Sequence, residues 1–211
     1  MPDDALADVC AAHSWRAGQL VVHGAGALGL DVLAPAAKAG AHVGSLHPVM
    51  VLHAHDDGND VLRGVTCSID GDETARGWLT AFATDLGMRP VHVAPEERVR
   101  YHASAALVGG LLAGLLADAS SLWDGMAGAG PGHMALGPMV EQAGRHCADG
   151  SGVMGPVARG DVATIEAHVA LLRAEAPHLL DLHAALVRSC LRHVDLADDT
   201  AAAIERAVRP A

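Results

Sequence analysis

The amino-acid sequence predicts an incomplete parallel α/β sheet of about four strands, followed by an all-helical domain. Up to residue 94, short β-branched or apolar runs alternate with stretches of helical periodicity, which is the pattern of βαβ units. After Pro95 only helical patterns follow. The composition fits closely packed helices, because 51% of the residues are apolar, only 2% are aromatic and 24 are glycine. We therefore expect an α/β domain at residues 1–94 and a helical domain at residues 95–211, with a mostly helical chain overall.

The elements of the first domain are each bounded by glycine or proline. Four apolar runs of strand length are expected to form the sheet, namely Gln19–His23, His42–Leu46, Val65–Ile69 and Arg89–Val93. Two stretches of helical periodicity lie between them, Leu28–Ala39 and Glu73–Leu86. Strands that alternate with helices in this order favour a mostly parallel sheet.

The second domain is expected to contain only helices. Helical patterns cover Glu96–Met126, Met139–Ala148, Asp161–Ala174, His178–Val194 and Asp199–Val208. The Asp161 carboxylate is placed to cap the first turn of its helix, and the glycine-rich and proline-rich stretch Gly125–Pro138 predicts a loop. The apolar run Tyr101–Ala117 is shorter than the ~20 residues that cross a bilayer, so we interpret it as a buried helix and expect no membrane partner.

Charge and cysteine content narrow the class of protein. The formal net charge is −11, from 14 Lys plus Arg against 25 Asp plus Glu, and no basic cluster offsets it, so we expect no nucleic-acid partner. The four cysteines lie far apart without a CxxC pair, and the first residues do not have the pattern of a charged and apolar leader, so we expect none. We expect a reduced, cytoplasmic chain.

One glycine-rich motif lies in the context that dinucleotide binding requires. Residues 24–29 read GAGALG, which matches GxGxxG after a predicted strand and before a predicted helix, so Gly24, Gly26 and Gly29 are candidates for cofactor binding. The acidic residue expected about 20 positions later is replaced by the run that contains Ser45 and His47. The alternative is an ordinary glycine-rich turn between a strand and a helix.

Two short runs that contain histidine are candidate sites. His53 and His55, followed by two aspartates, resemble a metal site, but a further ligand is needed, and the alternative is a solvated loop; we predict no metal. Tyr101 and His102 lie where strands give way to helices, and clefts at such places often bind ligands. His102 is a candidate general acid or base, the alternative being a buried structural histidine. No GxSxG nucleophile motif occurs.

Three runs of the sequence resemble a known family. They are Gly44–Pro48, Pro95–Ala103 and Gly155–Thr164, the last containing Gly-Pro-x-x-Arg-Gly-Asp. From about Pro2 to Val194 the chain resembles the Rossmann-like family that carries the domain of unknown function 2520. That family is similar to ketopantoate reductases and to the 6-phosphogluconate dehydrogenase superfamily. The resemblance implies an NAD or NADP cofactor, a nucleotide-binding domain, and a helical domain that completes the substrate cleft and commonly forms a homodimer.

The sequence departs from the family pattern in three places. Aligned with the family, residues 23–26 match a later turn that usually reads His-Thr-Ser-Gly, and the dinucleotide fingerprint would lie upstream of residue 1. The family's lysine before the Tyr-His pair is Arg98 here, and its Ser-Asn is Gly109-Gly110. Arginine keeps the charge but donates protons poorly, and glycine supplies no side-chain amide. The resemblance therefore predicts that NAD(P) binding is degenerate or lost.

These observations lead to two classes of function. The first is an oxidoreductase-like enzyme that acts on a small polar or keto-acid ligand, with His47, Tyr101 and His102 as catalytic residues and Ser45, Arg98 and Ser104 as substrate-binding residues. In this hypothesis Arg98 attracts the ligand's carboxylate, and the same cleft could run cofactor-independent acid–base chemistry as a lyase, isomerase or cyclase. The second is a dimeric binding module without chemistry of its own.

Overall fold

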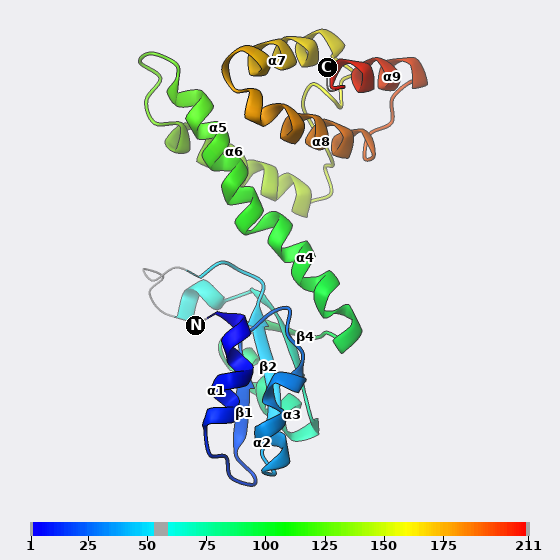
Figure 1. The fold of residues 1–211 in the computed structure, drawn as a ribbon. Helices are drawn as coiled ribbons and strands as arrows, with labels where there is room; N and C mark the ends of the chain where they lie inside the picture. The colour runs from blue at the N-terminus through cyan, green and yellow to red at the C-terminus, as the bar shows by residue number, and fades with distance from the viewer. Residues whose placement is uncertain (1, 53–58, 210–211) are drawn as a thin grey trace. The chain divides into compact units, whose positions relative to one another are not determined.

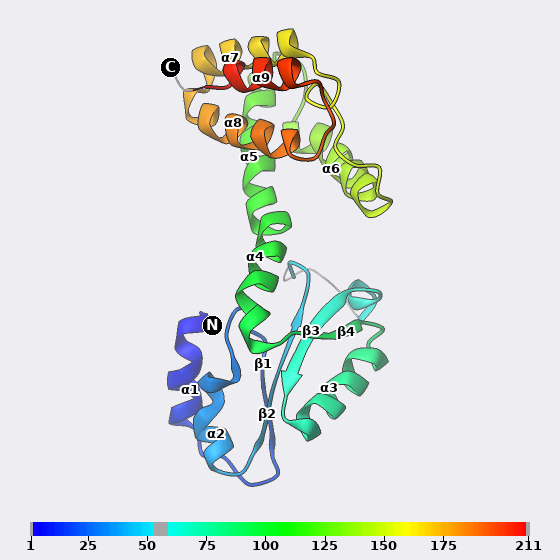
Figure 2. The ribbon, with the colours of Figure 1, turned by 90° about the vertical axis from the view of Figure 1, so that its right-hand side faces the viewer.

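The computed structural model describes residues 2–52 and 59–209. Two compact units make up the chain, Met1–Ala113 and Gly114–Ala211. Figures 1 and 2 show the strands in the first unit and only helices in the second. The predicted class, a partial α/β part followed by helices, is thus confirmed, and the change from strands to helices comes at Pro95. The division into units falls later, inside a helix.

The first unit is built on a four-stranded sheet in the order β1-β2-β3-β4. The strands are β1 (Leu20–His23), β2 (His42–Pro48), β3 (Thr66–Gly71) and β4 (Arg89–His92). All four lie where the sequence predicts them. The expectation of a parallel sheet needs one correction, because β2 and β3 pair antiparallel while the other two pairs are parallel. In the described part of the β2–β3 connection the only helical element is a single 3-10 turn, η3 (Asn59–Leu62), and an antiparallel pair needs no crossover helix.

Helices cover both faces of this sheet (Figure 2). One face carries α1 (Leu6–Ala12), which the sequence did not predict and which follows the 3-10 turn η1 (Asp3–Ala5). The same face carries α2 (Ala34–Lys38), which follows the 3-10 turn η2 (Leu30–Leu33). Their core is built from buried Cys10, Val21, Leu33 and Ala36. The other face carries α3 (Glu73–Asp85), whose Leu79 and Ala83 pack on Cys67 and Ile69 of β3. Successive residues of a strand face opposite sides, so Val43 and Leu46 of β2, three positions apart, join different cores.

The sheet leads into a helical stretch at η4 (Pro95–Glu97). It continues as α4 (Arg98–Val108) and α5 (Gly110–Asp124), which are separated at Gly109, where φ and ψ are −99° and −107°. The expectation of a buried helix here is wrong: none of the most apolar 18 residues of Pro95–Asp124 is buried. By length and composition this stretch could cross a membrane, although a single helix of this kind is weak evidence for a membrane segment.

The second unit contains α6 (Gly132–Ala148), α7 (Val162–Glu175), η5 (Pro177–Leu179), α8 (Leu180–Leu191) and α9 (Asp198–Ala207). The predicted cap is confirmed, because Asp161 accepts a hydrogen bond from the Thr164 amide. The predicted loop Gly125–Pro138 is too long, since α6 begins at Gly132, whose amide donates to the Asp124 carboxylate. The core is formed by apolar residues of α7, α8 and α9, including Ile165, Val169, Val187 and Ile204.

Candidate functional site

The register of the sheet brings polar residues of three strands onto one face. His23, Ser45 and Asp70 are direct neighbours across β1, β2 and β3. Two residues further along β2, His47 pairs with Ser68 of β3 on the same face. His23, Ser45, Ser68 and Asp70 are buried. Burying a polar group costs free energy unless it is hydrogen-bonded, so a row of buried polar side chains in a small sheet needs a specific explanation.

α4 lays three further side chains over this row. Arg98, Tyr101 and His102 are spaced i, i+3 and i+4, so they share one face of the helix. The Tyr101 hydroxyl lies 2.8 Å from Nδ1 of His47 and donates to the main-chain oxygen of His47 at 3.0 Å. The ring centroids of His47 and His102 are 6.0 Å apart. The structure therefore brings together the three residues predicted to be catalytic.

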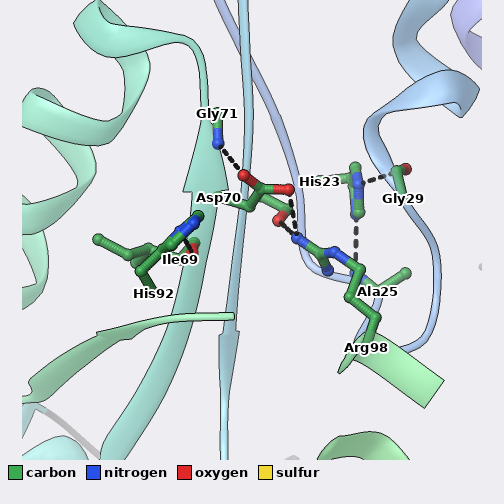
Figure 3. A network of polar contacts seen from close by, with 9 residues as sticks. His23, Ala25, Gly29, Ile69, Asp70, Gly71, His92 and Arg98 are labelled. Atoms are coloured by element: carbon green, nitrogen blue, oxygen red, sulfur yellow. Dashed lines mark hydrogen bonds and ion pairs between the residues drawn. The ribbon is translucent and has the colours of Figure 1, made fainter. Parts of the chain in front are cut away.

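Arg98 occupies the centre of the buried row (Figure 3). Only 2% of its side chain is exposed, and one guanidinium nitrogen donates to the Ser45 hydroxyl and to Oδ2 of Asp70, the latter at 3.4 Å. The other carboxylate oxygen of Asp70 accepts from the Gly71 amide at 2.8 Å. Arg98 and Ser45, both predicted to bind substrate, are buried against each other, and their role in substrate binding stays a prediction. Their contacts attach α4 to the sheet.

Several buried polar atoms around Arg98 have no hydrogen-bond partner within the described residues. They are Nε and Nη1 of Arg98 and the hydroxyl oxygen of Ser68. Native structures keep few such atoms, and each needs a specific explanation.

The glycine-rich turn packs directly against the two imidazoles. A Cβ added to Gly26 would lie 2.7 Å from Cδ2 of His102 and 2.8 Å from Cε1 of His47. Gly24 is different, because an added Cβ would meet only the main-chain oxygen of Leu46, at an ordinary 3.8 Å. Gly26 is therefore required by the histidine pair, and this steric role was not predicted from the sequence.

His23 closes the same turn. Its Nδ1 accepts from the Ala25 amide at 3.2 Å, and its Nε2 lies 3.2 Å from the carbonyl oxygen of Gly29 (Figure 3). Burial and the positive charge of Arg98 lower the pKa of His23, which keeps the ring neutral near pH 7. His23 and Asp70 were missed as site residues; the only signal in the sequence is their position at the ends of β-like runs.

A pocket of about 330 Å³ opens beside the histidines. His47 and His102 are the polar residues of its lining, and the rest is apolar side chains and glycine: Val49, Met50, Val51, Ala105, Ala106, Val108, Gly109 and Gly110. Burial lowers the pKa of His47, and repulsion by His102 and Arg98 adds to this effect while Asp3 opposes it. A neutral imidazole at the wall of a mainly apolar pocket can accept or relay a proton.

Two other sets of predicted residues do not join this site. Ser104 is exposed on α4 and donates to the Arg100 carbonyl oxygen of its own helix at 2.9 Å. His53 and His55, the alternative metal site, lie outside the described residues. Within residues 2–52 and 59–209, no group of three or more metal-ligating side chains is gathered together.

Comparison with known families identifies the chain. The model of the Domain of unknown function (DUF2520) matches residues 65–190, which is more than half of the 211 residues. The chain belongs to the DUF2520 family. A second model, the Rossmann-like domain, matches residues 1–48 of this DUF2520 protein. A search of curated proteins found no match to the chain. The predicted family is confirmed.

Two solved structures share the fold of this DUF2520 chain. One, from Bacteroides fragilis, is described as a candidate NADP oxidoreductase; it is 21% identical, with a TM-score of 0.66 over 81% of this chain and 64% of its own length. The other, from Thermotoga maritima, is 18% identical, with a TM-score of 0.71 over 91% of this chain and 75% of its own length. The DUF2520 chain thus spans about two thirds to three quarters of these neighbours.

The residues of this DUF2520 chain do not fit a dinucleotide at the predicted turn. A phosphate site needs free backbone amides and close approach over the glycines. Here the Ala25 amide already donates to His23, and the space over Gly26 is filled by two imidazoles. The turn leads into the four-residue 3-10 element η2, which has no side-chain cap, and the five-residue α2. Gly26 is therefore explained by its packing against His47 and His102, and neither Gly24 nor Gly29 shows a feature that requires a cofactor.

Proposed function

We propose that this chain is an oxidoreductase-like protein whose pocket beside His47 and His102 binds a small polar ligand and exchanges a proton with it. The observation that carries this proposal is the pair of imidazoles of His47 and His102, which pack on Gly26 and line the 330 Å³ pocket, with His47 held by Tyr101. A positioned acid–base group typically contributes 10²–10⁴-fold to a reaction.

The nature of the ligand follows from the pocket lining. A keto acid was expected because Arg98 was expected to attract its carboxylate, but Arg98 is engaged by Ser45 and Asp70. The described lining carries no formally charged side chain, so a ligand carboxylate would lose hydration without an ion-pair partner. The proposal therefore keeps a small polar ligand and favours an uncharged one.

The proposal assigns no step to NAD(P). A nucleotide cofactor is suggested by the family resemblance and by the description of the Bacteroides fragilis protein, but the glycine turn does not fit it. A ligand at 100 times its Kd stabilises a protein by about 2.7 kcal/mol, so bound NADPH would raise the Tm. Because the turn does not fit a dinucleotide, we expect no such rise. A clear rise that Gly24→Val abolishes would overturn this part of the proposal.

A proton-exchange assay tests the function without a cofactor. Hydroxyacetone, dihydroxyacetone and pyruvate are incubated with the full chain in deuterated water, and loss of the proton signal next to the carbonyl is followed by NMR. We expect exchange that His47→Gln and His102→Gln abolish, whereas His178→Gln, at an exposed position of the second unit, leaves it unchanged. Exchange that survives both pocket variants, or no exchange with any of the three compounds, would contradict the proposal.

A second candidate function, a dimeric binding module, is favoured by one observation. Val99, Leu107, Val108 and Leu111 are apolar and 63–71% exposed on α4 and the start of α5. Apolar groups exposed together mark interaction surfaces. We propose that a second copy covers them, which sedimentation equilibrium can test: the chain should sediment as a dimer and Leu107→Glu as a monomer. A monomeric wild-type chain would refute the dimer and leave the pocket proposal intact.

A further inference from the structure

The two contacts of the Tyr101 hydroxyl determine where the proton on His47 lies. A phenol has one proton to donate, while its oxygen can also accept. The main-chain oxygen of His47 can only accept, so at 3.0 Å it must receive the Tyr101 proton. The contact at 2.8 Å between the Tyr101 oxygen and Nδ1 of His47 is then a hydrogen bond only if Nδ1 is protonated. With the opposite tautomer, two acceptors would face each other at one of the two positions.

His23 provides the opposite case in the same unit. Its Nδ1 faces the Ala25 amide, which can only donate, so this nitrogen is unprotonated. Its Nε2 faces the Gly29 carbonyl oxygen, which can only accept, so Nε2 carries the proton. The surroundings thus fix two neighbouring histidines in two different tautomers.

Protonation of His47 at Nδ1 leaves Nε2 as the acceptor of a ring that lines the pocket. Within the described residues Nε2 has no hydrogen-bond partner, and it lies 2.9 Å from the position that a Cβ on Gly26 would take. Because Gly26 has no Cβ, the His47 ring can lie this close to the turn without a clash. Burial together with His102 and Arg98 favours the neutral ring over the charged one by lowering the pKa of His47, with only Asp3 acting in the opposite direction.

We propose that Tyr101 is a positioning residue that holds His47 as the Nδ1-protonated tautomer, so that Nε2 accepts a hydrogen bond from the hydroxyl of an uncharged ligand. The inference rests on the proposed ligand pocket and deepens it by naming the ligand class. At neutral pH a carboxylate is acceptor-only and finds no donor at Nε2. An alcohol of the same shape supplies the donor, and its carbon skeleton fits the apolar lining formed by Val49 and Ala105.

The tautomer is tested without any ligand by nitrogen NMR on isotope-labelled histidine. In the wild-type chain near pH 7.5, the resonances of His47 should show a protonated Nδ1 and an unprotonated Nε2, and those of His23 the reverse. Tyr101→Phe should move His47 toward the Nε2-protonated form while leaving His23 unchanged. The matched control on α4 is Ser104→Ala, which should move neither histidine. A wild-type His47 protonated at Nε2, or a Tyr101→Phe spectrum with unchanged His47, would overturn the proposal.

The ligand class is tested with two probes of nearly equal shape, isobutanol and isobutyrate. Saturation-transfer NMR near pH 7.5 should show at least tenfold stronger binding of the alcohol, and His47→Gln should remove the difference. Equal or stronger binding of isobutyrate would refute the donor preference. Binding of neither probe would contradict the pocket itself, a failure distinguishable from that of the tautomer, which is measured in the free protein.

Discussion

Replacing Gly26 by alanine is the sharpest perturbation of the histidine site. The added Cβ would lie 2.7 Å from His102 and 2.8–2.9 Å from two atoms of His47, far inside ordinary van der Waals contact. Both rings must move, which for overpacked sites typically costs about 1–3 kcal/mol. For a protein of this size a loss of roughly 2 kcal/mol lowers Tm by roughly 4–8 °C. We also expect the hydrogen bond between His47 and Tyr101 to be lost, because the His47 ring can no longer keep its place.

Thermal unfolding followed by the fluorescence of Trp15 and Trp78, both in the first unit, measures the effect. Gly24→Ala is the matched control, since its Cβ would meet only one atom, at 3.8 Å, and its Tm should stay close to that of the wild-type chain. Adding His102→Ala to Gly26→Ala should recover part of the loss, because it removes the closest contact. If the two glycine variants have the same Tm, the steric argument for the site is wrong.

Three further predictions concern the surroundings of the site. Arg98→Met should lower the free energy of unfolding by about 3–5 kcal/mol, because it leaves the buried Asp70 carboxylate unpaired. In the same urea titration Arg100→Met should cost less than about 1 kcal/mol, because the ion pair of Arg100 is exposed. Asp72→Ala should cost about 1 kcal/mol by removing the cap of α3, and Asp72→Asn should cost less, as urea unfolding can show. The pKa values of His23 and His47 are lowered in the folded chain, so the unfolded chain binds protons more readily. The free energy of unfolding should therefore be at its full value well above about pH 6.5 and should fall as the pH drops through that value. A double His23→Gln, His47→Gln variant with an unchanged pH profile would contradict this.

The strands could be predicted from the sequence because each depends on local features. β1 to β4 are short apolar runs ended by glycine or proline, and each was placed to within two residues. The direction of pairing is not local. The antiparallel contact between β2 and β3 depends on how the chain returns to the sheet, and the βαβ pattern did not reveal it.

Two helices were predicted less well, and the reasons differ. α1 has no side-chain cap at its first turn and only seven residues, so neither capping nor periodicity marks it. α6 contains Pro138 in its interior, a residue that normally ends a helix, and it starts at Gly132 because Asp124 binds the Gly132 amide. Both cases depend on tertiary contacts that outweigh the local signal.

The candidate site shows the same division between local and non-local information. Tyr101 and His102 were recognisable as neighbours in the sequence, and His47 was noted in the run that replaces the expected acidic residue. Asp70 and His23 became part of the site only through the register of three strands, which no short window of sequence contains. Arg98 was noticed for its charge, but its burial against Asp70 could not be foreseen from the sequence, because that contact joins residues far apart in the chain.

The glycine turn shows that one short motif can serve two opposite purposes: it can leave room for a ligand, or it can leave room for the protein's own side chains. In a dinucleotide site, glycines leave room for a phosphate to reach free amides at the start of a helix. In this chain the room over Gly26 is taken by His47 and His102, and the amide at Ala25 is taken by His23. The absent side chain therefore serves the protein's own imidazoles, so the identity of residue 26 should follow that of residues 47 and 102. A bulkier residue at position 26 should be tolerated only where one of the two histidines is replaced by a smaller side chain, which is the outcome that the Gly26→Ala, His102→Ala double variant measures directly.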